Sequence, residues 1–411
     1  MNNNPFTSDM FIRIWSKHFD KNNTGIHFSF VKNLLFLKHK FLPIYFNYGK
    51  THTKGIYYFV DHHCNLDLKG KVLLIYDVPT YFDINPEFKP NTLKLHKIRQ
   101  YPGYLINLES FKDYSEYING RFKGKSRNKL KRDKRRLENS FDIEYKIYYG
   151  DISKEEYDFI FGFFKMLLEK RFNEKGIYNN NLNPEEWDFY YEVAYPMIQD
   201  KKACLFVVKE KNNPICIMLN FLSHNSLYQF MMGFDIDYSK YNAGTTSIIK
   251  LLEWCGEKEL NILDFSKGYY PFKKRWGNLE YRFEYHIIYD SRSIRSFCMA
   301  FCLKYFFTLK QSLREKNINE ILHKFRFRSK NKKEINSQSY EFLDIDGTIE
   351  KESLKLIDFQ SAEEQHLKPI VLDFLYYNAE TLKNIKVYKI LDKMSRYLIV
   401  GENKSNILQL R

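Results

Sequence analysis

The feature that most constrains the fold is a run of three β-forming segments joined by tight turns between residues 204 and 234. Polar turns separate the segments, which are 204–210, 215–222 and 227–234. Because connections this short join antiparallel neighbours, the run predicts an antiparallel meander of three strands.

A helix and one more strand are expected after the meander. A polar loop, 235–244, leads to Thr245-Thr246-Ser247, a sequence that can cap a helix running to about Glu259. Residues 262–265 then form a short β-rich segment. A helix between two strands allows those strands to run parallel, so we predict a crossover connection here.

Two helices are expected before the meander. Ser153 is followed three residues later by Glu156, which is the spacing of a capping box, and this predicts a helix to about Phe172. Asn183 and Pro184 mark the start of the second helix, because proline is favoured in the first helical turn. Helices and strands therefore alternate in groups, which predicts an α/β (α+β) protein with mixed, mainly antiparallel sheets flanked by helices.

The chain has 411 residues, which suggests two or three domains at about 100–200 residues each. We divide it by pattern into an N-terminal lobe (1–120), a core (121–290) and a C-terminal extension (291–411) that begins with a basic helical segment. Further β-rich segments are 55–60, 71–78 and 388–410, the last of which suits a hairpin.

Positive charge is concentrated just before the core. The formal net charge is +15, and between Arg121 and Arg136 there are ten lysines or arginines and one acid, Asp133. Such a run is often a solvated helix face, but ten mutually repelling charges also favour an anionic partner. Phosphorylated ligands, nucleic acid and an anionic membrane surface all satisfy that requirement.

Cysteine usage and the N-terminus indicate a cytoplasmic protein. The cysteines form no CxxC pair, and the chain opens without a basic-then-apolar signal pattern. His62-His63-Cys64 lacks a second ligand pair, so no metal is expected. The apolar run 297–307 is too short to span a bilayer, but its helix is amphipathic enough for peripheral contact with a membrane surface. The six cysteines are Cys64, Cys204, Cys216, Cys255, Cys298 and Cys302.

The junction between the loop and the helix, Tyr241-Asn242-Ala243-Gly244-Thr245-Thr246, is the main candidate for a binding site. Gly244 permits close approach of a ligand to the backbone. The helix that starts there presents unpaired N–H groups and the positive end of its dipole, which together suit a pyrophosphate. An ordinary capped surface helix is the alternative interpretation.

Three segments resemble the GNAT acyltransferases, in particular the branch of CelD-like proteins linked to exopolysaccharide synthesis, and more distantly the Fem-type aminoacyl transferases. The resemblance covers about residues 120–290. Its motifs are Lys125-Ser126-Arg127-Asn128-Lys129-Leu130-Lys131-Arg132, Gly233-Phe234-Asp235 with Tyr241-Asn242-Ala243-Gly244, and Asp264-Phe265-Ser266-Lys267-Gly268 with Pro271-Phe272-Lys273-Lys274-Arg275-Trp276-Gly277. Phe272 stands where the family often has tyrosine, and Tyr269-Tyr270 stand where acidic residues are frequent.

The resemblance implies two GNAT-like lobes, the second complete, an acyl-CoA such as acetyl-CoA as co-substrate, and a set of site residues. Asp264 is expected as general base or amine-orienting group, Lys273 as a contact to phosphate or oxyanion, and Tyr269 as an acid for the leaving thiolate. A helix cap, a solvated lysine and a buried packing tyrosine are the respective alternatives. The residues implied for the cofactor are Met232, Gly233, Tyr241, Asn242, Ala243, Gly244, Thr245 and Thr246. Those implied for the substrate are Arg127, Gly268 and Trp276.

The predicted function is N-acyl transfer from acyl-CoA to an amine, with an amino sugar in cell-surface polysaccharide assembly as the expected acceptor. The first alternative is a Fem-type transferase that uses aminoacyl-tRNA, which the basic run favours. The absence of a long heptad-patterned helical arm disfavours it. The second alternative is a non-catalytic basic nucleic-acid-binding protein, which gives no reason for the segment 264–277.

Overall fold

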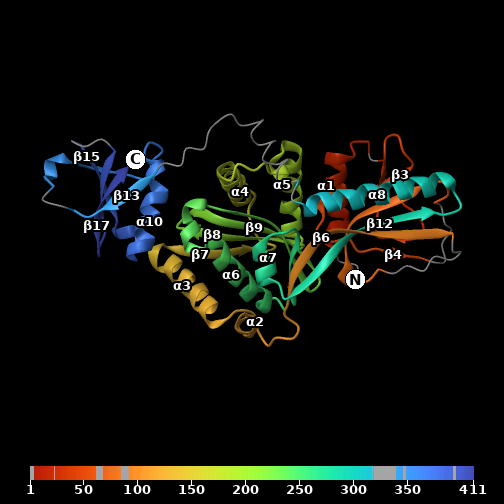
Figure 1. Ribbon diagram of the computed structural model, residues 1–411, viewed down its shortest axis with the longest axis horizontal. Coiled ribbons are helices and arrows are strands. Elements are labelled where there is room, and N and C mark those ends of the chain that lie inside the picture. Colours follow the sequence, from red (N-terminus) through yellow and green to blue (C-terminus); the bar gives the residue numbers. More distant parts are fainter. Residues whose placement is uncertain are drawn as a thin grey trace.

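The computed structural model describes residues 4–22, 24–61, 68–84, 92–316, 318, 339–345, 349–391 and 395–411. A ten-stranded mixed sheet runs through the described part of the first 290 residues (Figure 1). Its strands in spatial order are β2 (Phe36–Lys38), β3 (Ile44–Asn47), β5 (Val72–Pro79), β12 (Leu279–Asp290), β6 (Leu93–Asn107), β11 (Ile262–Lys267), β10 (Ser226–Phe234), β9 (Asn213–Ser223), β8 (Ala203–Glu210) and β7 (Ile143–Tyr148).

The predicted meander is confirmed by β8, β9 and β10, which pair antiparallel in sequence order. The predicted crossover is also confirmed, because β10 pairs parallel with β11 and α6 (Ala243–Glu257) connects them. The second strand of the meander begins two residues earlier than the predicted residue 215, so the turn before it is shorter than expected. β9 begins at Asn213 and includes Pro214, whose ring is tolerated beside the turn.

Helix α6 begins two residues earlier than the sequence predicted. A six-residue 3-10 helix, η5 (Ile236–Tyr241), occupies most of the loop before it. Asn242 is the N-cap, and its φ of 53° lies in the left-handed region, which asparagine tolerates better than most residues. Thr245 and Thr246 therefore lie inside the first turn and do not cap the helix.

Helices cover both faces of the sheet (Figure 1). One face packs against α1 (Asp9–Phe19), α4 (Lys154–Glu174) and α5 (Pro184–Gln199). The other packs against α2 (Tyr114–Arg121), α3 (Gly124–Ser140) and α6, and farther along against α8 (Ile294–Glu315). The predicted capping of α4 is confirmed, because the Ser153 hydroxyl accepts from the Glu156 N–H at 3.2 Å.

The strand β6 joins the N-terminal region to the core. It is 15 residues long and lies between β11 and β12, pairing antiparallel with both. The β-rich segment 55–60 gives only a two-residue strand, β4 (Phe59–Val60), paired with β1 (Val31–Lys32). No local pairing partner extends it, so the longer strand expected there does not form in the described residues.

After α8, the described residues of the C-terminal extension from 339 onward form a separate five-stranded sheet accompanied by α10 (Lys368–Asn378). Its strands are β13 (Tyr340–Leu343), β14 (Leu354–Ile357), β15 (Lys386–Ile390), β16 (Arg396–Val400) and β17 (Ser405–Leu410). The hairpin expected at 388–410 is formed by β16 and β17, with β15 pairing on the outer edge of β16. Short helices fill the remaining turns: η1 (Pro5–Thr7), η2 (Lys50–His52), η3 (Thr80–Phe82), η4 (Asn180–Leu182), α7 (Pro271–Trp276), η6 (Lys351–Ser353), η7 (Gln365–Leu367) and η8 (Leu382–Asn384).

Candidate active site

The strands β10 and β11 separate after one short stretch of pairing. Their parallel register covers residues 226–228 of β10 and ends at the pair Tyr228–Asp264. Beyond it, no pairing between these two strands occurs in the described residues, although β10 continues to Phe234 and β11 to Lys267. Two diverging edges carry backbone groups that an extended ligand can pair with.

A bulge in β10 lies at the start of this opening. The register of β10 with β9 shifts between Gln229 and Met231, which leaves one extra residue on β10. Met232 and Gly233 follow the bulge and remain paired with β9 on the opposite edge. A Cβ at Gly233 would lie 3.0 Å from the Phe164 ring, so glycine here allows α4 to pack closely on the strand.

Asp264 is completely buried at the closed end of the opening. Its side chain lies on the opposite face of β11 from Leu263 and Phe265, which pack with α6. The Tyr281 hydroxyl donates to the carboxylate at 2.7 Å, and the Tyr81 hydroxyl donates to Oδ2 at 3.1 Å. Burial raises the pKa of Asp264 to about 6, although these hydrogen bonds and one from the Ser266 N–H act in the opposite direction.

Lys273 is buried close to Asp264. Its ammonium donates to the carbonyls of Lys267 and Ser266, at 2.7 and 3.2 Å, at the end of β11. Burial lowers the pKa of Lys273 to about 7, and the neighbouring Lys54 adds to that effect. The carboxyl and the amine therefore both titrate near neutral pH, where groups that exchange protons with a substrate work best.

Further charged groups surround this pair. Lys267 forms an ion pair with the buried Asp77 at 2.5 Å. Burial lowers the pKa of Lys54 to about 8. The Ser266 hydroxyl and Asp77 Oδ1 are buried without a hydrogen-bond partner in the described structure. Because buried polar atoms are normally paired, these two mark positions where a ligand or water completes the site.

The N-terminus of α6 has no side-chain cap. The N–H groups of Thr245 and Thr246 both bond to the Asn242 carbonyl, so in the described structure those of Ala243 and Gly244 are the ones left for a ligand. A Cβ at Gly244 would lie 3.6 Å from Met232, so the first turn packs on the end of β10. The uncapped helix end and the opening between β10 and β11 therefore adjoin each other.

Two of the residues expected at the cofactor hold the junction together. The Asn242 amide donates to the buried carboxylate of Asp133 at 2.7 Å, which is the single acid within the basic run of α3. Tyr241 is buried, and its hydroxyl donates to the Leu372 carbonyl of α10 at 3.3 Å. Asp133 thus fixes the unusual backbone of the N-cap, and Tyr241 attaches the C-terminal extension.

Two further residues predicted for the site, Gly268 and Tyr269, lie directly after β11. Gly268 follows β11 with a φ of +130°, where a Cβ would lie 2.9 Å from the Tyr270 ring. Tyr269 is 46% exposed, and its hydroxyl accepts from Gln311 of α8 rather than facing Asp264. The hydroxyl groups that contact Asp264 belong to Tyr81 and Tyr281 instead.

Trp276 and Arg127 are held by neighbouring protein groups. Trp276 is buried, its ring centroid is 4.9 Å from that of Phe122, and its carbonyl accepts from Tyr117. Arg127 donates to the carbonyls of Asn119 and Phe122, at 2.9 and 3.1 Å, at the end of α2. A direct role in substrate binding stays a prediction for both.

Sequence reasoning missed the residues that reach Asp264 from other elements. Tyr281 lies on β12 opposite Gly103 of β6, and a Cβ at that glycine would stand 2.3 Å from the tyrosine ring. Tyr81 and Lys54 come from the N-terminal region, far from the core in sequence. The glycine opposite an aromatic residue is a usable signal, but only once the register of β6 and β12 is known.

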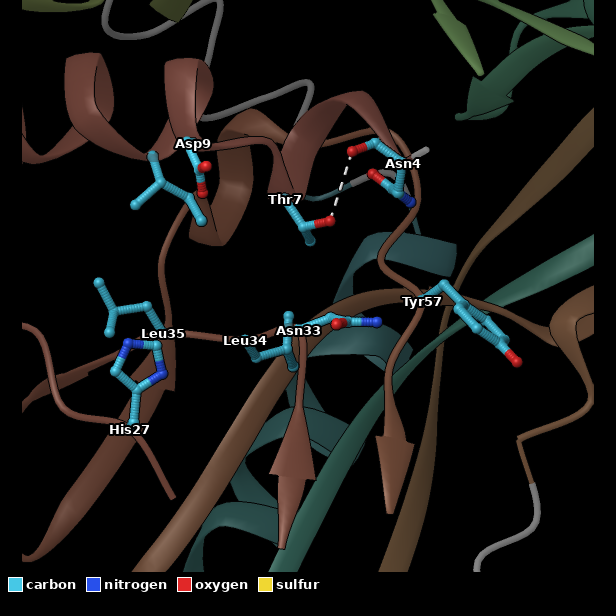
Figure 2. A pocket seen from close by; sticks show the side chains of 9 residues that line it. Asn4, Thr7, Asp9, His27, Asn33, Leu34, Leu35 and Tyr57 are labelled. Carbon is cyan, nitrogen blue, oxygen red and sulfur yellow. Dashed lines mark hydrogen bonds between the residues drawn. The ribbon is translucent and has the colours of Figure 1, made fainter. Parts of the chain in front are cut away.

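Two cavities lie elsewhere in the molecule. One of about 270 Å³ beside the start of α1 is lined by Asn4, Thr7, Asp9, His27, Asn33, Leu34, Leu35 and Tyr57, among others (Figure 2). A second of about 550 Å³ shares its N-terminal wall. Neither is lined by Asp264 or by residues 241–246. His62-His63-Cys64 lies outside the described residues, and within them no three potential ligands are grouped to hold a metal.

Comparison with known proteins gives one family match. Residues 124–274, from the start of α3 into α7, match the family described as an acetyltransferase (GNAT) domain. No curated protein matches the chain. Distantly similar solved structures include a conserved protein of unknown function from Bacteroides thetaiotaomicron (11% identity, 70% of this chain and 91% of that chain, TM-score 0.44). They also include L-PGS from Bacillus licheniformis (13%, 72% and 97%, 0.43) and FemX (12%, 62% and 83%, 0.41).

Proposed function

We propose that this acyltransferase, whose residues 124–274 match an acetyltransferase (GNAT) domain, uses an acyl-CoA and acylates the amine of an amino sugar or similar glycan precursor. The reaction belongs in this proposal to cell-surface polysaccharide assembly, on the cytoplasmic side where acyl-CoA is supplied. The observation that carries the proposal is the divergence of β10 and β11 after the pair Tyr228–Asp264, beside an uncapped helix end.

The donor enters from the face of α6 in this proposal. Its pyrophosphate lies at the N–H groups of Ala243 and Gly244, and the rest of the cofactor runs between the diverging strands. The thioester carbonyl then reaches the segment after the β10 bulge. A backbone N–H near Met232 or Gly233 stabilises the negative charge that develops on the carbonyl oxygen.

The acceptor approaches from the opposite face, where Asp264 and Lys273 lie. The amine nitrogen attacks the thioester carbon, the carbon–sulfur bond breaks, and the CoA thiolate leaves. The amine proton passes to neutral Lys273, or through the Tyr81 hydroxyl to Asp264, and the thiolate takes up a proton as it departs. Holding both substrates in this geometry supplies a large part of the rate.

The charges around the site favour an acceptor that also carries an anionic group. Lys54, Lys267 and Lys273 face two carboxylates, Asp77 and Asp264, so one positive charge is in excess when all are ionised. A phosphate attached to an amino sugar supplies the missing charge. Comparing product formation by mass spectrometry with amino-sugar phosphates and with neutral amino sugars tests this choice, and preference for the neutral acceptors would count against it.

Calorimetry with a panel of CoA thioesters tests the donor site. Gly244→Glu places a carboxylate against the expected pyrophosphate, while a charge of that sign at a helix N-terminus does not destabilise the helix. We expect the variant to bind at least about tenfold more weakly than the wild type. The matched control is Gly256→Glu at the other end of α6, where a Cβ would meet nothing within 4 Å.

Two results would refute the assignment in different ways. Failure of every thioester to bind the wild type removes the acyl-CoA function. Equal binding by wild type and Gly244→Glu keeps the function but moves the phosphate site away from α6.

The exposed basic face of α3 favours a Fem-type, aminoacyl-tRNA-dependent transferase as the second candidate. Lys125, Lys131, Arg132 and Arg135 are exposed along this helix. Charge reversal at Lys129, Lys131 and Arg132 should abolish RNA binding if the donor is a charged tRNA. Tight binding of acetyl-CoA without RNA affinity would exclude it. A non-catalytic nucleic-acid-binding protein leaves the acetyltransferase match unexplained.

A further inference from the structure

No described residue covers the outer face of α8, which is apolar. Ser296, Ala300, Phe307 and Gln311 are its buried side chains and point toward the sheet. The opposite side exposes large apolar residues, which are Ile294 (82% exposed), Phe297, Tyr305 (65%), Phe306, Leu309 (60%) and Leu313. In Figure 1 this helix runs along the outside of β12 and β6.

Six exposed residues form a single helical stripe, which Phe297 and Phe306 flank. Ile294, Cys298, Cys302, Tyr305, Leu309 and Leu313 recur at intervals of three and four, and all are exposed. At about 1.5 Å per residue the stripe is roughly 28 Å long and contains no charged residue. Contiguous apolar surface of this length is unusual on a protein that nothing contacts.

The charges on α8 indicate what covers the stripe. The helix carries four basic residues, Arg295, Lys304, Lys310 and Arg314, and one acid, Glu315. Arg295 and Lys310 are exposed, whereas Arg314 faces the sheet and donates to the Tyr285 hydroxyl at 3.4 Å. Glu315 is already paired with Arg99. The sequence that follows adds six lysines or arginines and no acid between residues 324 and 333. A second copy would bring the same positive charges together, whereas an anionic lipid surface neutralises them.

A turn close to α8, residues 39–43, also combines an exposed apolar side chain with lysines. The Ser296 hydroxyl donates to the Lys71 carbonyl, and the N–H of the next residue, Val72, donates to the Pro43 carbonyl. The turn at 39–43 therefore lies at the same end of the sheet as the first turn of α8. It exposes Phe41 (77%) and is flanked by Lys38 and Lys40.

We propose that α8 is an interfacial helix that lies on an anionic lipid bilayer, with its apolar stripe at the level of the headgroups and the exposed Arg295 and Lys310 on the lipid phosphates. No helix in the described part of the chain is long and apolar enough to cross a membrane, so the contact is peripheral. The Gln311 amide donates to the Tyr269 hydroxyl at 2.8 Å, which places the loop after β11 beside the membrane-facing helix. This inference does not depend on the identity of the acyl acceptor.

Vesicle co-sedimentation of the full chain tests the proposal. The vesicles are equimolar phosphatidylglycerol and phosphatidylcholine, compared with pure phosphatidylcholine. We expect binding to the anionic vesicles only, decreasing as salt is added. Replacing Tyr305→Glu together with Leu309→Glu should lower the partition coefficient at least about tenfold, because two inserted side chains are lost. Ile294→Glu is the second variant and should weaken binding in the same direction.

The matched control is Leu356→Glu, which is 61% exposed on the C-terminal sheet and should leave vesicle binding unchanged. Absence of wild-type binding to anionic vesicles would overturn the proposal, as would equal binding by the α8 variants. Sedimentation velocity adds a third outcome. A wild-type dimer that the α8 variants convert to monomer would show that the stripe binds a second copy instead of lipid.

Discussion

At the scale of single residues, the site depends on two side chains that burial pushes toward the same pKa. Asp264 is raised to about 6 and Lys273 is lowered to about 7, each mainly by loss of water. Both could be named from the motif 264–277, because the motif is local in sequence. Tyr81, Tyr281 and Lys54 could not, because they reach the site from distant elements whose pairing no local pattern reports.

The buried carboxyl should make stability depend on pH. A carboxyl whose folded pKa is raised stabilises the fold when protonated, so its contribution is present near pH 4 and is lost as pH rises through about 6. We expect Asp264→Asn to gain up to about 3 kcal/mol in unfolding free energy relative to the wild type between pH 4 and pH 7. Urea unfolding across this range measures the difference. The exposed Asp151→Asn should show no such trend, and a pH-independent difference at Asp264 would contradict the shift.

The lowered pKa of the buried Lys273 should support the rate of acyl transfer. Lys273→Arg keeps the positive charge but removes an amine that can lose its proton near neutral pH. We expect the turnover rate at pH 7.5 to fall by at least about a hundredfold, since general base catalysis contributes at that level. Steady-state acyl transfer with saturating acyl-CoA measures it. Lys274→Arg, on the exposed side of α7, is the control; equal rates in both variants would remove Lys273 from the reaction.

At the scale of elements, local sequence signals located the helices and strands between residues 153 and 267, whereas β6 and β12 were not predicted. The errors lie where tertiary contacts decide. Ser153 caps α4 as its spacing predicted. The start of α6 was displaced because Asn242 adopts a left-handed conformation that its bond to Asp133 stabilises. That contact spans 109 residues, so the threonines that looked like caps could not reveal it.

The carboxylate of Asp133 should support both stability and cofactor binding. Asp133→Ala removes the acceptor of the Asn242 amide and of the Lys129 ammonium. We expect the unfolding free energy to fall by about 1–3 kcal/mol, and acyl-CoA affinity to fall with it because the first turn of α6 loses its anchor. Denaturant titration and calorimetry measure the two effects. Asn128→Ala, exposed on the same helix, should change neither, and an unaltered Asp133→Ala would show that the N-cap needs no partner.

At the scale of the whole molecule, the three regions that the sequence pattern separated share one sheet and one apolar cluster across their boundaries. The strand β6 belongs to the N-terminal region by sequence but is paired on both edges with strands of the core. The C-terminal extension has its own sheet, yet α10 buries Leu372 and Leu375 in the cluster that contains α3 and α6. Composition cannot show such sharing, because pairing across the sheet leaves no local trace.

The docking of the extension should depend on one ion-pair network. Lys368 of α10 and Lys170 of α4 both contact Asp235, and although burial raises the pKa of that carboxyl, the two lysines outweigh it and hold it below its usual value. Lys368→Met should speed hydrogen exchange of the α10 amides by at least about fivefold while those of α5 stay protected. Mass spectrometry of peptide fragments measures this. Lys383→Met, exposed beyond α10, is the control; unchanged α10 exchange would mean that apolar packing alone holds the helix.

The long strand β6 also sets an order of events during synthesis. It leaves the ribosome well before its two partners, which begin at residues 262 and 279. Until these partners are synthesised, the 15-residue segment of β6 has no strand to pair with on either edge. Unpaired strand edges can pair with other nascent chains and cause aggregation. We expect four residues of this segment to limit such aggregation, because side-chain charge and the missing N–H of proline disfavour pairing with other chains. They are Lys94, Lys97, Arg99 and Pro102.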